Sequence, residues 1–434
     1  MSVCRSECLD NRHAACRLRG QPSVKVMLPK AVADRPANLS STPMNFATAS
    51  KLRRCLPVAA VGCGVALGVN ETSHGQYVRQ QLSGIVPIAY DVSPNGSIVV
   101  GKSRDPQGSS SKATWWNRQT GTMHQLPGVD AYAYGISADG STIVGEMYYP
   151  SDQRYRPVWW NRASNTMQAL ANCFTSPPPY TGGGRALGAS SNGSIIVGGS
   201  TCPNESGAYW ERATNTLRYV GVLAYGMSAD SSIITGRKYD LAINQFVPAW
   251  WNRLTGTIGY LQTLGYAGVA NGATPDGAIL FGRVREEFAV VWHPSWWTRN
   301  NGSLNLLPRL GGQDAEVNDA NADGSLFVGF ADDAQQVMRA VCWNRTAGTV
   351  DVLPGSTSEA VAVSSSGMTI VGGDSIWIRQ CPADIDRNNY VDGTDLGTLL
   401  SQWSSTGSAD LNEDGVVNGA DIGILLGNWG PCLN

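Results

Sequence analysis

Residues 137–145 read Ser-Ala-Asp-Gly-Ser-Thr-Ile-Val-Gly, a turn followed by an apolar strand that ends in glycine. Asp-Gly and Asn-Gly pairs are typical of tight hairpins because they tolerate the positive φ that such turns require. The pattern recurs about every 40 residues, and a period of this size is typical of repeat architectures. Seven copies are present, with their turns at Asn95-Gly96, Asp139-Gly140, Asn192-Gly193, Asp230-Ser231, Asp276-Gly277, Asp323-Gly324 and Ser366-Gly367.

An aromatic pair follows each of the first five turns, and its second member, a tryptophan, is kept after the sixth and seventh. In the first six copies the pair begins 16 to 19 residues after the second turn residue, while in the seventh Ile376-Trp377 follows Gly367 after only 9. A position that is filled in every unit favours packing between units, although exposed tryptophans that stack on sugar rings are the alternative. The first six pairs are Trp115-Trp116, Trp159-Trp160, Tyr209-Trp210, Trp250-Trp251, Trp296-Trp297 and Cys342-Trp343.

Each unit carries the signals of four short strands, which in the second unit fall at 131–137, 141–146, 157–161 and 166–170. Such units predict the blades of a β-propeller, with a stacked solenoid as the alternative. The seventh unit ends after its third strand, near Ile378, while an unmatched strand at 77–82 precedes the first turn. We therefore predict a mainly β fold, a seven-bladed propeller over residues 77–380 closed by its N-terminal strand, which removes exposed sheet edges.

The unit at 133–145 with the following Pro157-Val158-Trp159-Trp160 resembles the HAF repeats of bacterial extracellular proteins. The resemblance covers about residues 77–380. The His-Ala-Phe triplet of that family is replaced here, for example by Ala113-Thr114-Trp115. The resemblance implies secretion or surface display, and it implies no activity.

The N-terminal region has the pattern of a secretory signal, because Lys51-Leu52-Arg53-Arg54 precedes an apolar run from Leu56 to Val69. Most signals begin within about 30 residues of the start, so we expect Met44 to be the initiator and residues 1–76 to be a disordered leader. An ordinary buried segment and lipidation at Cys63 are alternatives. No apolar run reaches the roughly 18 residues of a membrane-spanning helix. We expect a monomer that is secreted or held at the cell surface.

The cysteines of an exported chain meet an oxidising compartment. Cys173 and Cys202 flank an irregular stretch rich in proline and glycine, and Cys381 and Cys432 flank the acidic C-terminal segment, so we predict these two disulfides. Cys342 takes the place of an aromatic residue in its repeat, which favours a buried thiol.

Residues 384–395 and 410–421 are two copies of one acidic loop, 26 residues apart. Oxygen-bearing side chains stand at loop positions 1, 3, 5 and 12, and a main-chain carbonyl at position 7 completes a set suited to Ca²⁺, which takes about six to eight oxygens. We predict two ions, one held by Asp384, Asp386, Asn388, Tyr390 (main chain) and Asp395, the other by Asp410, Asn412, Asp414, Val416 (main chain) and Asp421. Asp392 and Asn418 are expected to contribute through water, and Asn389 and Gly415 to make the turn at position 6.

The repeat continues beyond the loops, where Leu399, Leu400 and Trp403 match Leu425, Leu426 and Trp429, so two loop–helix units are expected to pack on each other through these faces. Residues 381–434 therefore resemble a type I dockerin. The resemblance implies calcium-dependent docking to a cohesin or another cell-surface partner. The basic residues common on dockerin recognition helices are missing, however, and glycines stand at 397, 423 and 427. An acidic, turn-rich tail is the alternative.

The composition excludes several functions. The chain has 32 Lys and Arg against 34 Asp and Glu, and this balance argues against a protein that binds nucleic acid through phosphates. Beyond the leader only His124 and His293 remain, and neither has metal-ligand spacing or an adjacent nucleophile. We expect a non-enzymatic interaction or scaffold protein. A polysaccharide-acting enzyme, a glycosidase or lyase with carboxylates clustered at one mouth of the ring, and a carbohydrate-binding lectin are the alternatives.

Overall fold

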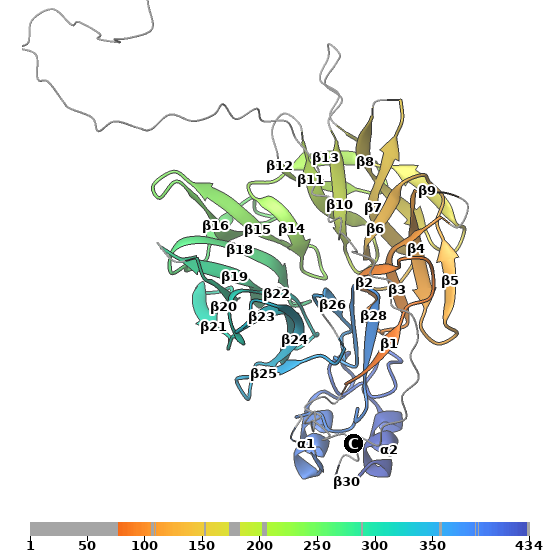
Figure 1. Ribbon diagram of the computed structural model, residues 1–434, viewed down its shortest axis with the longest axis vertical. Coiled ribbons are helices and arrows are strands. Elements are labelled where there is room, and N and C mark those ends of the chain that lie inside the picture. The colour runs from red at the N-terminus through yellow and green to blue at the C-terminus, as the bar shows by residue number, and fades with distance from the viewer. Residues whose placement is uncertain are drawn as a thin grey trace, which may run out of the picture. The chain divides into compact units, whose positions relative to one another are not determined.

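The structure is a computed structural model that describes residues 77–431 apart from 106–107, 109, 152, 173–182, 202–205, 288–289, 356–357, 387 and 389. The predicted leader, its signal segment and Met44 lie outside the described residues. Figure 1 shows the described chain from β1 (Tyr77–Gln81) to the C-terminal module. Within these residues, no helix combines the length and the apolar character that crossing a membrane demands.

The described part of the propeller forms seven antiparallel sheets of four strands, as the repeats predict. In six of these sheets the strands lie in chain order, so each of these blades is built from one repeat. The first blade consists of β2 (Ile88–Val92), β3 (Ile98–Arg104), β4 (Ser111–Asn117) and β5 (Thr122–Gln125), and the second of β6 (Ala131–Ile136), β7 (Thr142–Tyr149), β8 (Arg154–Asn161) and β9 (Thr166–Ala169). The third consists of β10 (Gly184–Ala189), β11 (Ile195–Ser200), β12 (Ser206–Glu211) and β13 (Thr216–Tyr219), and the fourth of β14 (Leu223–Met227), β15 (Ile233–Asp240), β16 (Gln245–Asn252) and β17 (Ile258–Tyr260). The fifth consists of β18 (Gly265–Ala273), β19 (Ile279–Glu286), β20 (Trp292–Thr298) and β21 (Ser303–Leu306), and the sixth of β22 (Gly311–Ala320), β23 (Leu326–Asp333), β24 (Met338–Asn344) and β25 (Thr349–Val352).

The seventh blade contains β26 (Ala362–Val363), β27 (Thr369–Gly372), β28 (Ser375–Arg379) and, beside β28, the N-terminal strand β1 (Figure 1). Tyr77 pairs with Arg379 and Gln81 with Ser375, in antiparallel register. The Tyr77 hydroxyl also donates a hydrogen bond of 2.6 Å to the carbonyl of Gly367. The predicted closure of the last blade by the N-terminal strand is therefore confirmed.

The first strands of the blades form a closed series. Each contacts the first strand of the next blade, from β2 through β6, β10, β14, β18, β22 and β26 back to β2. These strands therefore surround the central channel of a propeller. The turns at their ends are also joined from blade to blade, as where the backbone N–H of Asp139 donates to the carbonyl of Ser191 at 3.0 Å.

The aromatic pairs hold neighbouring blades together. The second member is at most 2% exposed in six copies, namely Trp116, Trp160, Trp210, Trp297, Trp343 and Trp377. Its indole N–H donates to the segment that enters the same blade, as from Trp160 to the carbonyl of Pro127 at 2.8 Å. In the first five copies the first member lies under an arginine of the next blade, as Trp159 lies 4.9 Å below the guanidinium carbon of Arg212. It is half-buried where it is a tryptophan. The packing interpretation is confirmed, and this burial argues against a lectin that uses exposed tryptophan pairs.

The C-terminal module consists of α1 (Gly393–Ser401), α2 (Gly419–Gly427) and the paired short strands β29 (Tyr390–Val391) and β30 (Gly430–Pro431). The two helices contact each other through Leu399 and Leu425, which are both fully buried. Met368 of the seventh blade belongs to the same hydrophobic cluster. The module is therefore packed on the propeller.

Candidate metal centre

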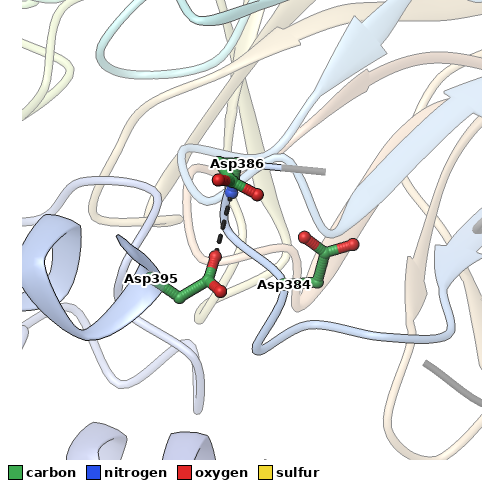
Figure 2. Close-up of side chains that lie close together, drawn as sticks. All are labelled: Asp384, Asp386 and Asp395. Carbon is green, nitrogen blue, oxygen red and sulfur yellow. Dashed lines mark hydrogen bonds between the residues drawn. The ribbon is translucent and has the colours of Figure 1, made fainter. Parts of the chain in front are cut away.

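The first acidic loop brings three carboxylates together. Asp384, Asp386 and Asp395 each place one oxygen within 4.8 Å of the others, and Figure 2 shows these side chains around one point between the loop and the start of α1. Asp384 and Asp395 are fully buried. Like charges repel strongly where water is excluded, so this aspartate triad is suited to a bound cation.

Asp395 is held in the triad by the loop backbone. Its Oδ1 accepts the N–H groups of Ile385 at 2.7 Å and of Asp386 at 3.1 Å, the latter drawn as the dashed line in Figure 2. Its Oδ2 accepts the N–H of Asp392 at 2.9 Å, while Asp392 caps the helix by accepting the N–H of Thr394 at 2.7 Å. This capping box begins α1 at the point where loop position 12 must face positions 1 and 3.

The second loop repeats this geometry at the 26-residue offset. Asp421 accepts backbone N–H groups from Leu411 at 2.7 Å, Asn412 at 3.2 Å and Asn418 at 2.7 Å. Asn418 caps α2 as Asp392 caps α1. In this loop Asn412 stands where the first loop has Asp386, so three carboxylates converge in the first loop while the second combines carboxylates with an amide. The two loops predicted from the sequence therefore share the same pattern of hydrogen bonds from the backbone to the aspartate at position 12.

The other predicted ligands occupy the expected places in these loops. At position 5, Asn388 accepts the N–H of Tyr390 at 2.8 Å, and Asp414 accepts that of Val416 at 3.0 Å. At position 7 Tyr390 and Val416 are 51% and 46% exposed, so their side chains point to solvent. Only their main-chain atoms therefore remain to face the loop. Gly415 has φ of +95°, as the turn at position 6 of the second loop requires, whereas Asn389 lies outside the described residues.

The electrostatics of the loops suit a hard cation. Burial raises the pKa of Asp386, and the neighbouring Asp395 carboxylate raises it further. Burial also raises the pKa of Asp410, whereas the hydrogen bond from the Asn412 amide lowers the pKa of Asp414. A cation would favour the charged forms of the buried acids. Carboxylate, amide and main-chain oxygens are the ligands that Ca²⁺ prefers, so the residues present fit this ion.

A cavity of about 480 Å³ adjoins the first loop. Asp386 and Asn388 lie in its wall on the module side, and Asp323, Asn344 and Thr346 lie on the side of the sixth blade. An entry path is one of the requirements of a metal site, and this cavity provides one to two of the predicted ligands.

The prediction that the matching apolar residues all face the helix contact is wrong for four of them. Leu399 and Leu425 are fully buried, but the others are about half exposed, with values of 52% for Leu400, 48% for Trp403, 54% for Leu426 and 51% for Trp429. Adjacent residues of a helix point about 100° apart, so only one leucine of each pair can face the partner helix. We call Leu400, Trp403, Leu426 and Trp429 the repeated apolar face.

The sequence did not indicate how the module attaches to the propeller. Glu413 forms an ion pair with Arg118 of the first blade and accepts a hydrogen bond of 3.2 Å from Ser366 of the seventh. Ser408 donates a hydrogen bond of 2.9 Å to Asp323 of the sixth blade. These contacts join residues up to 295 positions apart, which a local sequence pattern does not reveal. Glu413 also stands at a loop position that supplies no metal ligand, so the ligand spacing did not single it out.

The cysteine predictions fall largely outside the described residues, which exclude Cys173, Cys202 and Cys432. Cys381 is disulfide-bonded. Its partner is not among the described residues, so both predicted pairings stay predictions. Cys342 is a buried thiol, 4% exposed, as its place in the repeat indicates.

Comparisons with known proteins assign no family. No family model matches the chain, and no curated protein matches it. Among solved structures, the chain is similar to TolB from Acinetobacter baumannii, with 10% identity, a TM-score of 0.43, and coverage of 66% of this chain and 64% of that chain. It is also similar to a putative TolB from Agrobacterium tumefaciens, with 12% identity, a TM-score of 0.41, and coverage of 61% and 95%. The HAF-repeat and dockerin resemblances therefore stay predictions, and the propeller assignment rests on the sheet topology.

Proposed function

We propose that this chain is an exported, non-enzymatic interaction protein. Its propeller presents a binding surface, and its C-terminal module, with two bound Ca²⁺ ions, attaches it to a cell-surface or extracellular protein of the cohesin kind. The observation that carries the proposal is the 26-residue repeat, which is kept both in the hydrogen bonds of the loops and in the repeated apolar face.

The repeated apolar face supports attachment to a protein. Four large apolar side chains at two equivalent sites are about half exposed, although the module buries other apolar residues completely. Exposed apolar patches are typical of protein interaction sites. Because the face consists of two equivalent halves, a partner could engage either half after a half-turn of the module.

Both histidines beyond the leader have structural partners, which supports a non-enzymatic role. His124 stacks on Trp115 at 4.0 Å between ring centres. His293 lies 3.2 Å from the carboxylate of Glu286 at the edge of the fifth blade. His124 is thereby held by a ring contact and His293 by a carboxylate of its own blade.

Calcium titration of the full chain by calorimetry tests the module. We expect two equivalents to bind, because each loop has a complete set of oxygen ligands. Asp395→Asn and Asp421→Asn should each remove one equivalent, whereas Asp276→Asn, in an exposed propeller turn, should retain both. Binding of no calcium, or equal binding by all four proteins, would refute the metal assignment.

Attachment is tested with a variant of the repeated apolar face in which Leu400, Trp403, Leu426 and Trp429 are replaced by Ser. The full chain should retain a protein from solubilised envelopes of the producing cells in calcium and release it in EGTA. The variant should retain none of it while it still binds two equivalents of calcium. Retention that survives both EGTA and the substitutions would contradict attachment through this face.

A further inference from the structure

The first strands of six blades carry a β-bulge at the same place. In each, one residue is skipped in the pairing with the second strand, because the register shifts there. A bulge bends the strand and redirects a side chain, and bulges are frequent beside functional sites. The skipped residues are Tyr90, Tyr134, Leu187, Tyr225, Asn271 and Asn318.

Tyr134 and the two asparagines at these bulges each hold a glutamate. The Tyr134 hydroxyl donates to Glu146 Oε1 at 2.7 Å, although the Glu146 side chain is only 7% exposed. The carboxylate of Glu146 also lies 3.4 Å from Arg185 of the third blade. The bulge of the second blade therefore positions a nearly buried carboxylate beside the channel.

The asparagine bulges do the same for two further acids. Asn271 Nδ2 donates to Glu316 at 2.6 Å, and Asn318 Nδ2 donates to Glu359 at 3.2 Å. Each asparagine also donates to a main-chain carbonyl of the following blade, which fixes its orientation. Arg283 completes this side, with Nη1 at 3.2 Å from Glu316. Three glutamates from different blades are thus held by directed partners.

These groups belong to four consecutive blades of the ring, from the sixth through the seventh and the first to the second. Burial raises the pKa of Tyr90, and Tyr132, Glu146 and Glu359 raise it further. Burial likewise raises the pKa of Glu316, to which Glu359 also contributes. Tyr90 and Tyr134 lie 5.2 Å apart between ring centres. We call Tyr90, Tyr132, Tyr134, Glu146, Glu316 and Glu359 the mouth cluster.

The mouth cluster and the C-terminal module lie at opposite ends of the channel. Tyr132 stands at the start of the first strand of its blade, and Glu359 precedes the first strand of its own. Asp323 and Ser366, which bond to the module, lie in turns that follow the ends of the first strands. The module therefore leaves the mouth cluster free.

The charges of this region indicate the kind of ligand. Two of the glutamates lie beside a cation, Glu146 beside Arg185 at 3.4 Å and Glu316 beside Arg283 at 3.2 Å. Arg283 also pairs with Asp314 at 2.9 Å, and the Lys102 ammonium lies 4.7 Å from the ring centre of Tyr132. Acids and cations that are paired with each other give little net attraction to a strongly anionic or cationic ligand. Carboxylate acceptors and cationic donors suit a ligand with many hydroxyl groups, and tyrosine rings suit its apolar C–H faces.

We propose that the mouth cluster binds a neutral oligosaccharide. The inference rests on the proposed function only in that the propeller is the binding part of the attached protein, and it does not require the metal sites. Tyr90, Tyr134, Glu316 and Glu359 are half-buried and so remain open to a ligand. Their partners hold them in place beforehand, which reduces the entropy lost on binding.

Calorimetry of the full, calcium-loaded chain with neutral hexasaccharides tests this. The probes are cellohexaose, xylohexaose, mannohexaose and chitohexaose, with hexagalacturonate as the anionic control. We expect at least one neutral probe to bind at millimolar concentration or below, and hexagalacturonate to bind more weakly. Glu146→Gln and Tyr134→Phe should each weaken binding by about tenfold, because the first replaces a charged acceptor by a neutral one and the second removes a hydroxyl group.

The matched control is Glu211→Gln, since Glu211 also pairs with an arginine, Arg218 at 2.9 Å, but on the outer strands of the third blade. It should bind the sugar as the parent chain does. Tyr134→Phe keeps the ring and serves if Glu146→Gln does not fold. Binding of no neutral probe, tighter binding of hexagalacturonate, or unchanged affinity in Tyr134→Phe would overturn the inference.

Two further readouts separate this inference from the proposed function. A chain that takes up two equivalents of calcium but binds no sugar would overturn only the saccharide site. Chromatography of the bound hexasaccharide after incubation reports on chemistry. Cleavage that is lost in Glu146→Gln would confirm the site and overturn the non-enzymatic part of the proposed function, while intact sugar would support both.

Discussion

Arg118 of the first blade forms an ion pair with Glu413 of the C-terminal module. In the next blade the equivalent residue, Arg162, lies over Trp115 of the preceding blade. Before the first blade the preceding position is Ile376, which offers no aromatic face. The module thus supplies, at the closure of the ring, a partner that the seventh blade lacks.

We predict that Arg118→Ala lowers the free energy of unfolding by about 3 kcal/mol. The two side chains are only 20% and 9% exposed, and removal of one member of a buried pair leaves the other charge without compensation. Urea unfolding of the full chain in calcium measures the loss. Arg218→Ala is the control, because its pair with Glu211 is exposed and should contribute less than about 1 kcal/mol. Equal losses in the two variants would contradict a structural role for the Arg118 pair.

Calcium removal should destabilise the propeller as well as the module. A ligand that binds only the folded state at a concentration about 100 times its dissociation constant adds about 2.7 kcal/mol per site. Because Met368, Ser366 and Asp323 of the propeller contact the module, the gain should extend to the blades. Thermal unfolding with and without EDTA, followed by far-ultraviolet circular dichroism of the strands, measures the shift. A β-sheet transition that calcium leaves unmoved would show that the blades do not depend on the module.

The stability of the calcium-loaded chain should fall as the pH rises from about 4 to about 7. Burial raises the pKa values of Asp91 and Asp319 to about 7, and the Asp319 charge also raises that of Asp91. An unfolded aspartate titrates near 3.8, so within this window the folded state binds more protons than the unfolded state. Urea unfolding at several pH values in saturating calcium measures the slope. Asp91→Asn should flatten the slope, and a slope that stays the same in this variant would contradict the assignment.

Neighbouring leucines of α1 should differ sharply in their contribution. Leu399→Ala removes a fully buried side chain and should cost about 3 kcal/mol, whereas Leu400→Ser, at a half-exposed position, should change stability by about 0.5 kcal/mol or less. Urea unfolding of both variants in calcium gives the comparison. The pair Leu425→Ala and Leu426→Ser should reproduce it in α2. A comparable loss at Leu400 would mean that the repeated apolar face belongs to the core.

The repeats made the blades predictable because their signals are local. Turn chemistry and the aromatic spacing recur within each unit, and the strand missing from the seventh unit indicated the role of β1. The loop ligands were predictable for the same reason, since calcium ligation follows a fixed spacing along one segment. Helical periodicity could also have separated Leu399 from Leu400 before the structure was known.

The mouth cluster could not be predicted in this way. Glu316 and Glu359 each stand eight residues before the second turn residue of their repeats, whereas Glu146 lies on the second strand of its blade, and only the ring brings the three together. The repeat pattern identifies the residues that all blades have in common, whereas the residue types of the mouth cluster are not common to all seven blades. Glu413 is similar, because its partner follows from the fold and not from its own loop. Loss of the aromatic residue at Ile376 was the one sequence signal of an altered contact at the closure.

Deletion of β1 should expose an edge strand and make the protein associate. A chain that begins at residue 77 keeps all five pairings of β1 with β28, while one that begins at residue 84 leaves β28 paired with β27 alone, as an edge strand. An exposed edge offers backbone groups to another chain, so the shorter protein should form oligomers or aggregates. Light scattering after size-exclusion chromatography distinguishes a monomer from these species. Tyr77→Phe should remain monomeric but lose about 1 kcal/mol, because it removes only the hydrogen bond to Gly367. A shorter chain that remains a monomer with unchanged unfolding would show that the ring does not depend on its N-terminal strand.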